Sequence, residues 1–160
     1  NKPDDETMEF WEKLKNLGNI FPKINYSDLV YIALRDFEPA EDSLIKKHKV
    51  RVFSVPEVRK KAVERIAIES LNYLDHCDMI YVSFDVDCMD SRISAGTGTP
   101  VPNGMSEKEA GNLVYYLMRS KKISCFEMVE INPTLDKENL MAENAFEILS
   151  KAINQLSHDL

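Results

Sequence analysis

Hydrophobic and polar residues recur with two different periods along this chain, and the period predicts where its helices and strands lie. Apolar residues return every three or four positions in five segments, whereas four shorter runs are almost continuously apolar. The first pattern is typical of amphipathic helices and the second of buried strands. The predicted helices span residues 4–18, 39–49, 56–76, 106–121 and 136–156, and the predicted strands lie within residues 28–36, 50–55, 79–87 and 123–133.

Local signals refine several of these helices. Ser106 is expected to cap the helix that follows it, with Glu109 completing a capping box. The first helix carries Met8, Trp11, Leu14 and Leu17 at helical spacing. The helix at 56–76 is expected to be one long element whose buried side carries Val58, Ala62, Ile66, Ile68, Leu71 and Leu74.

The alternation of helices with apolar strands predicts the fold class. It indicates a single α/β domain over residues 1–160, with a mainly parallel sheet covered by helices on both faces in a three-layer αβα arrangement. In such sheets the functional crevice lies beyond the carboxyl ends of the strands. The segments at these ends are 35–38, 54–55, 85–87 and 130–132, and three of the four are acidic. We therefore expect a negatively charged crevice.

Charge and cysteine content narrow the possible partners. The formal net charge is −7, from 27 acidic and 20 basic residues, and no stretch combines clustered Lys and Arg with aromatics. Nucleic acid is therefore not an expected partner, and no apolar run has the length of about 20 residues that a membrane helix needs. The three cysteines are widely spaced, which favours a reduced, intracellular protein without structural disulfides.

Asp85 and Asp87 are the first candidate ligands. Because side chains alternate along a strand, we expect the two carboxylates to point the same way at the mouth of a buried strand. Their mutual repulsion would be relieved by a hard cation such as Mg²⁺ or Mn²⁺. The alternative is that the pair caps neighbouring helices or binds Lys and Arg.

Glu130 ends another strand, where it is expected to share one face with Phe126 and Met128. A carboxylate in this position can form a bidentate pair with a guanidinium, although a helix cap or an internal salt bridge would also explain it.

The segment "SAGTGTPVPNG" at 94–104 is not a phosphate-binding P-loop, because it lacks the GK[ST] ending. Its glycines permit tight turns and close approach to a ligand, and Thr97 and Thr99 could donate hydroxyls; a plain surface connection is the alternative. Cys88 is interpreted as a small filler. We expect none of the histidines to be a ligand: His48 should lie in an exposed turn, and His76 and His158 lie far from the strand ends.

With these residues identified, the chain resembles the C-terminal half of the ureohydrolase family, which includes arginases and agmatinases, and is most similar to the arginases. "SFDVDCMD" and "GTGTPVPNG" match a metal-binding segment of that family and the loop after it. "EMVEINPTLDKENLMAENAFEIL" resembles the segment leading into its last helix, and "YIALRDFEPAE" resembles its substrate loop. The likeness runs from about residue 28 to residue 153.

The resemblance implies an activity and a role for each matching residue. The reaction would be hydrolysis of L-arginine to L-ornithine and urea, with two Mn²⁺ ions activating water. Asp85 would bridge the two ions and Asp87 would complete the ligands of one. Glu130 would hold the substrate guanidinium, Thr99 would line the pocket, and Glu38, on a loop supported by Asp36, would approach the α-amino end. The resemblance also implies a cytoplasmic homo-oligomer acting on a small guanidino compound.

The sequence also departs from the family pattern. Cys88 and Ser91 stand where the family commonly has Gly and Pro, Asn103-Gly104 replaces a usual Gly-Gly, and Glu38 replaces a typical Asp. The histidine-containing metal motifs of the family have no equivalent here. We therefore expect this chain to be the C-terminal part of a longer domain that supplies the remaining ligands.

Three other readings remain open. One is an agmatinase-like hydrolase of another guanidino compound, and another is a non-catalytic ureohydrolase-like subunit. The third is a phosphatase of the haloacid-dehalogenase type, whose Asp-x-Asp strand end "FDVDCMD" also resembles, although that reading leaves "GTGTP" and "VEINP" unexplained.

Overall fold

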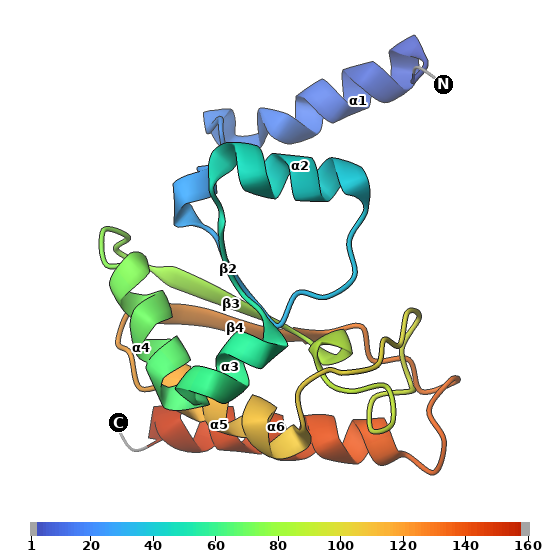
Figure 1. The fold of residues 1–160 in the computed structure, drawn as a ribbon. Coiled ribbons are helices and arrows are strands. Elements are labelled where there is room, and N and C mark those ends of the chain that lie inside the picture. The colour runs from blue at the N-terminus through green and yellow to red at the C-terminus, as the bar shows by residue number, and fades with distance from the viewer. Residues whose placement is uncertain (1–2, 158–160) are drawn as a thin grey trace.

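A computed structural model describes residues 3–157 as an alternation of helices and strands, as the sequence predicts (Figure 1). The helices are α1 (Asp5–Lys15), α2 (Pro39–His48), α3 (Val55–Lys61), α4 (Val63–Tyr73), α5 (Glu107–Leu117) and α6 (Leu140–Ser157). The strands are β1 (Val30–Ile32), β2 (Arg51–Phe53), β3 (Ile80–Asp85) and β4 (Ile123–Val129). The predicted capping box is confirmed, because Ser106 Oγ accepts from the N–H of Glu109, whose carboxylate accepts from the N–H of Ser106.

The strands pair in parallel, as expected, but they form two separate two-stranded sheets within the described chain. β1 pairs with β2, and β3 pairs with β4 in a register that sets Asp85 opposite Val129. Within these residues β1 and β3 are each paired on one side only. Each therefore presents one row of main-chain groups that no described strand satisfies.

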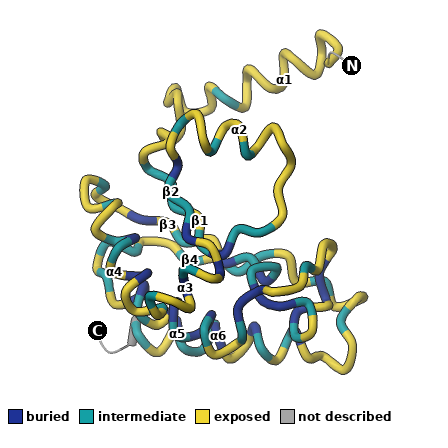
Figure 2. The backbone as a smooth tube through the Cα atoms, in the orientation of Figure 1, coloured by how far each residue is buried: buried dark blue, intermediate teal, exposed yellow. Residues whose placement is uncertain are grey.

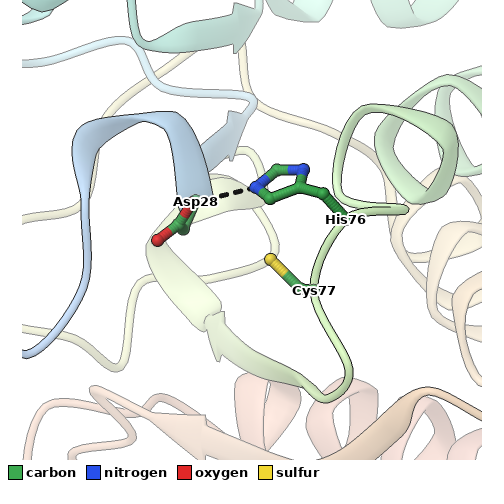
Figure 3. Close-up of side chains that lie close together, drawn as sticks. All are labelled: Asp28, His76 and Cys77. Atoms are coloured by element: carbon green, nitrogen blue, oxygen red, sulfur yellow. Dashed lines mark hydrogen bonds and ion pairs between the residues drawn. The ribbon is translucent and has the colours of Figure 1, made fainter.

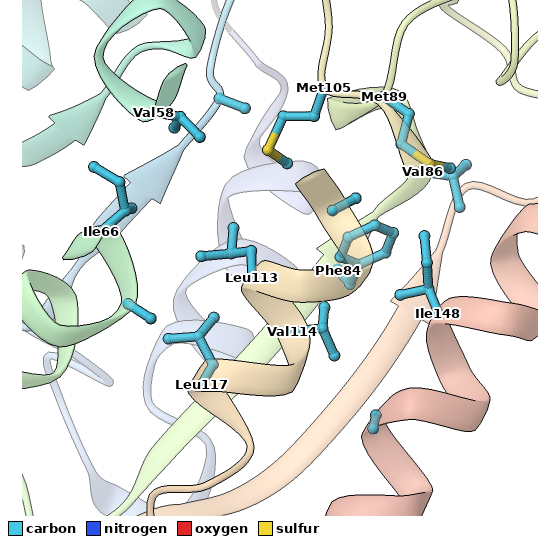
Figure 4. Packing of buried hydrophobic residues seen from close by; sticks show 14 of the residues in the cluster. Val58, Ile66, Phe84, Val86, Met89, Met105, Leu113, Val114, Leu117 and Ile148 are labelled. Atoms are coloured by element: carbon cyan, nitrogen blue, oxygen red, sulfur yellow. The ribbon is translucent and has the colours of Figure 1, made fainter. Parts of the chain in front are cut away.

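The hydrophobic core lies between the β3–β4 sheet and helices α3 to α6, which gather on one side of it, while α1 and α2 lie at the opposite end of the molecule (Figure 1). Apolar side chains from β3, from the turn that follows it and from α5 and α6 interdigitate there (Figure 4). The members that carry most of this packing include Phe84, Val86, Met89, Met105, Leu113, Val114, Leu117 and Ile148.

The other face of the β3–β4 sheet is not covered by any helix of the described chain (Figure 2). Tyr81 is 55% exposed, and its neighbours on this face, Ser83, Cys125 and Glu127, are also exposed. The hydroxyl of Ser83 donates to the Glu127 carboxylate across the pair at 2.8 Å. These strands therefore alternate between a buried apolar face and a polar open face, a pattern that antiparallel sheets usually show.

The helix expected at 56–76 is broken in two at Ala62, which has φ 69° and ψ 150°. Because this conformation is one that almost only glycine adopts readily, the chain turns there, and a second helix starts on a new axis. The break also changes the buried side: Val58 and Ile66 are buried as expected, whereas Ile68 is 43% exposed.

The N-terminal helix α1 forms where its period predicts, yet none of its residues is buried. Asp4 caps it by accepting from the N–H of Thr7 at 2.7 Å. Its apolar residues Met8, Trp11 and Leu14 are 42%, 54% and 59% exposed, so their helical spacing does not reflect packing within the described chain. No helix among residues 3–157 combines the length and the apolar character that crossing a bilayer requires.

Candidate functional site

A cavity of about 600 Å³ runs between the two sheets and is lined along its length by β1 and β3. At the carboxyl ends of these strands its wall includes Arg35, Asp36, Asp85, Asp87 and Thr99. The rule that places the crevice at the carboxyl ends of parallel strands thus matches one end of this cavity, which also extends along both strands. The candidate residues at two of the four predicted strand ends therefore face one cavity.

Asp85 and Asp87 come together through a turn rather than through strand alternation. β3 ends at Asp85, and Val86–Cys88 forms a short 3₁₀ helix, so the expectation that both carboxylates stand on one face of a strand is wrong. Oδ1 of Asp85 accepts from the N–H of Asp87 at 2.8 Å and thereby caps this turn. The turn brings the second aspartate back to the mouth of the strand.

One oxygen of Asp87 is left without a partner. Thr99 Oγ1 donates to Oδ2 at 2.8 Å, whereas Oδ1 is buried and has no hydrogen-bond partner among the described residues. A buried carboxylate oxygen without a partner is costly unless a cation or a donor satisfies it. Carboxylate oxygens are the ligands that Mn²⁺ and Mg²⁺ prefer, so the donor set at Asp85 and Asp87 fits a hard divalent cation.

Glu130 contributes a third negative charge to this site. It directly follows β4 with φ 66°, a left-handed conformation that is uncommon for a residue with a side chain. Side chains alternate between the two faces of β4 only as far as Val129, where the strand ends. The alternation that places Phe126 and Met128 on one face therefore does not determine where the Glu130 side chain points. Its carboxylate makes no hydrogen bond or ion pair within the described part of the chain, so it is free to receive a ligand.

The pKa of Asp85 reflects this crowding of carboxylates. Burial raises the pKa, and the negative charges of Asp87 and Glu130 raise it further, whereas the N–H of Asp87 and the charge of Arg35 oppose the rise. A raised carboxyl pKa means that the ionised form is penalised where it stands. A bound cation would remove that penalty, which is the second observation that fits a metal at this site.

Arg35 holds the turn that carries the aspartates. Its guanidinium donates to the main-chain oxygens of Asp87, Cys88 and Met89 at 2.5, 3.0 and 3.2 Å, and to that of Val101 at 3.1 Å. No sequence motif indicates that Arg35 binds these main-chain oxygens, because in the sequence it is simply a polar residue at the end of a predicted strand. Its place directly before Asp36, in the segment "LRDFE", is the one signal that could have drawn attention to it.

The loop at 94–104 is shaped by contacts within the protein. Asp90, which is buried, accepts from the N–H and the Nε of Arg92 and from the N–H of Asn103. The Arg92 guanidinium, together with these N–H groups, lowers the pKa of Asp90 to about 2. A side chain at Gly104 would meet the main chain of Met89 at 2.3 Å, so this glycine serves close packing of two backbone segments. Thr97 is buried and its hydroxyl has no described partner.

Glu38, Glu130 and His48 are not among the residues that line the cavity, whereas Cys88 is. Glu38 is exposed and precedes α2, where its N–H donates to the Glu41 carboxylate at 2.7 Å, and it is not part of the cavity wall, whereas Asp36 is. Burial raises the pKa of the Cys88 thiol, in keeping with its interpretation as a filler. His48 is half-buried, because its ring stacks on Tyr26 with centroids 3.7 Å apart, and not in an exposed turn as expected; His158 lies outside the described residues.

Comparison with known proteins identifies the family. A sequence model described as "Arginase family" matches residues 15–154. The chain belongs to the arginase family. This membership removes the phosphatase alternative.

Relatives and solved structures agree with this membership. Over 144 residues the chain is 31% identical to an arginase of Bacillus subtilis strain 168, an overlap that includes 90% of this chain and 49% of that protein. The crystal structure of Helicobacter pylori arginase superposes with a TM-score of 0.86 at 28% identity, covering 97% of this chain and 52% of that one. The formimidoylglutamase of Bacillus subtilis gives a TM-score of 0.80 at 25% identity, covering 92% and 45%.

These relatives confirm the arginase-like α/β fold and the ureohydrolase family. The chain spans about half the length of the relatives that it matches. The open sheet face and the separation of β1 from β3 are therefore features of a chain that covers part of the family fold. The three cysteines of this arginase-family chain are free, as their spacing predicts.

A Gly104→Ala substitution tests whether the loop at 94–104 must pack against the main chain of Met89 as closely as Gly104 allows. Since the added methyl would lie 2.3 Å from a main-chain carbon that cannot move freely, we expect a loss of about 3 kcal/mol in the free energy of unfolding. Urea denaturation of the protein measures it. Gly98→Ala is the matched control, because nothing lies within 4 Å of its added methyl, and it should change stability by less than about 0.5 kcal/mol. Equal effects of the two substitutions would contradict the packing argument.

Proposed function

We propose that this chain is the C-terminal part of a manganese-dependent ureohydrolase that converts L-arginine to L-ornithine and urea. The observation that carries the proposal is the unpartnered, buried oxygen of Asp87 beside Asp85 at the mouth of one cavity, with the charge of Glu130 acting on Asp85. Membership of the arginase family supports it. The proposal includes the cytoplasmic, homo-oligomeric state that the family resemblance implies.

Asp85 and Asp87 would hold the metal ions in this proposal. Two divalent cations bound there would make a water molecule acidic enough to provide a nucleophile near neutral pH. Thr99 keeps Asp87 oriented by donating to Oδ2, which leaves Oδ1 for a ligand. The remaining ligands would come from polypeptide beyond the half of the family fold that this chain spans. The cavity between β1 and β3 supports this, because it leaves room beside both aspartates.

Glu130 would bind the substrate guanidinium. Its carboxylate has no partner among the described residues, and its charge acts on Asp85, so a cation held by Glu130 would lie next to the metal ligands. A guanidinium offers two parallel N–H groups to a carboxylate, which makes such a pair both strong and directional. Glu130 would therefore position the guanidinium carbon for attack.

The recognition of the amino-acid end is assigned to Glu38, on the loop that Asp36 would support. Because Glu38 is exposed and outside the cavity wall, a guanidino substrate without an α-amino group, such as agmatine, is the second candidate. The structural likeness to a formimidoylglutamase supports a substrate other than arginine as the alternative.

Urea release from the full-length protein tests the function. We expect urea from L-arginine in the presence of Mn²⁺, little after the metal is removed by a chelator, and less from agmatine than from arginine. The reverse order of the two substrates would favour the agmatinase-like alternative. Release from neither substrate, with manganese bound, would favour a non-catalytic subunit and reject the proposal.

Asp87→Ala tests the metal site directly. Since the substitution removes both carboxylate oxygens, the variant should lose most of its bound manganese, measured by elemental analysis after gel filtration. Asp5→Ala, in the exposed helix α1, is the control and should retain the full metal content. Unchanged manganese in the Asp87 variant would remove this residue from the ligand set.

Glu130→Gln tests the substrate contact separately from the metal. The amide keeps the shape of the side chain but loses the charge, so kcat/KM for arginine should fall by about 10- to 100-fold, as expected for a lost charge-assisted pair. Manganese content should not change. A variant with wild-type kcat/KM would show that another group binds the guanidinium.

A further inference from the structure

We propose that Asp28, His76 and Cys77 form a zinc site at the amino-terminal edge of β1 and β3. These residues offer one oxygen, one nitrogen and one sulfur atom that all lie within 4.8 Å of one another. Figure 3 shows the three side chains converging from two segments that are far apart in the sequence. This site is distinct from the carboxylates of the candidate active site, because Asp28 precedes β1 and Cys77 precedes β3, whereas Asp85 ends β3.

A tetrahedral zinc site needs its ligand atoms closer together than the 4.8 Å within which these three atoms lie. With Zn–N and Zn–O bonds of about 2.0 Å and a Zn–S bond of about 2.3 Å, ligand atoms lie about 3.3–3.8 Å apart around the ion. Nε2 of His76 and Oδ1 of Asp28 are already 2.9 Å apart, joined by a hydrogen bond. An ion would replace the proton shared in that bond, so the ring and the carboxylate need only small movements to admit it.

The carboxylate of Asp28 is held in place by other donors. The N–H and the side-chain amide of Asn25 donate to Oδ2 at 3.0 and 2.9 Å, and Ser27 Oγ donates to Oδ1 at 2.9 Å. Outer partners of this kind fix the orientation of a ligand before the metal arrives and raise the affinity of the site. The short helix Tyr26–Asp28 thus presents Asp28 toward His76.

The ligand types select the metal. A thiolate and an imidazole favour Zn²⁺ over Mn²⁺ or Mg²⁺, which prefer oxygen ligands. On binding, the Cys77 thiol releases its proton to solvent and the sulfur bonds to the ion. The side chains of His76 and Asp28 are 52% and 22% exposed, so an ion can reach the site and water can complete its coordination.

A metal here would connect the two sheets. Asp28 leads into β1, and residues 76–77 lead into β3, two strands that do not pair with each other in the described chain. Asp28 and His76 are 48 positions apart in the sequence. The site would therefore join two distant segments at an edge of the cavity. The role that fits this position is structural, holding β1 and β3 at a fixed separation.

Cobalt substitution of the full-length protein tests the proposal. Co²⁺ bound to a thiolate absorbs in the near ultraviolet, and Co²⁺ bound only to carboxylates does not show this band. We expect the wild-type protein to show the thiolate band and to lose it on adding Zn²⁺. Cys77→Ser should abolish the band, and Asp28→Asn should weaken Co²⁺ binding at least about tenfold. Cys125→Ser, which alters an exposed thiol on β4, is the matched control and should keep the band.

The zinc site and the proposed ureohydrolase function are tested independently, so either can fail while the other holds. Asp87→Ala should lose manganese while keeping the cobalt–thiolate band, and Cys77→Ser should keep manganese and urea release. Zn²⁺ should also raise the melting temperature of the wild type but not that of Cys77→Ser. Absence of the band in the folded wild-type protein, or its survival in a Cys77→Ser variant whose circular dichroism is native, would overturn the zinc site.

Discussion

The guanidinium of Arg35 is the interaction on which the candidate active site depends. Residue 35 extends from β1, and the carbonyls that it binds belong to the turn at 87–89 and to Val101, in the loop beyond β3. No strand pairing joins β1 to β3 in the described residues, and this fork of N–H groups links the two sheets at their carboxyl ends. A lysine could not replace it, because a single ammonium group cannot reach that many carbonyls in fixed directions.

The same arrangement leaves the acidic side chains of the site without an ion pair among the described residues. Arg35 directs its N–H groups at main-chain oxygens, and within residues 3–157 no basic side chain forms an ion pair with Asp85, Asp87 or Glu130. Such a cluster would be costly if it had to stay empty and ionised. The turn and the loop thus hold the carboxylates in a configuration that gains free energy when cations bind, and a metal ion and a guanidinium both meet that requirement.

Much of this could be predicted from the sequence, and the failures have local causes. The order and approximate positions of the helices and strands, and the Ser106–Glu109 cap, followed from periodicity and side-chain hydrogen bonding, which act over a few residues. Asp85 and Asp87 lie close together as predicted, but the predicted geometry was wrong, since a 3₁₀ turn and not a strand sets their relation. Such a turn, like the helix break at Ala62, depends on what the surrounding fold imposes on the backbone. Arg35 and the Asp28–His76–Cys77 cluster join segments some fifty positions apart, and no local pattern reports such contacts.

These long-range contacts lie at the two ends of the cavity between β1 and β3. β1 and β3 line this cavity, and the chain spans about half the length of its relatives, so the gap between these strands belongs to a chain that covers part of the family fold. Arg35 fixes the separation of the strands at one edge, and the hydrogen bond from His76 to Asp28 fixes it at the other. Side chains therefore join β1 and β3 at both ends of the space between them. A segment that enters it, or a ligand that binds at its mouth, meets a site whose shape is already formed, so less of the binding free energy is spent on ordering the protein.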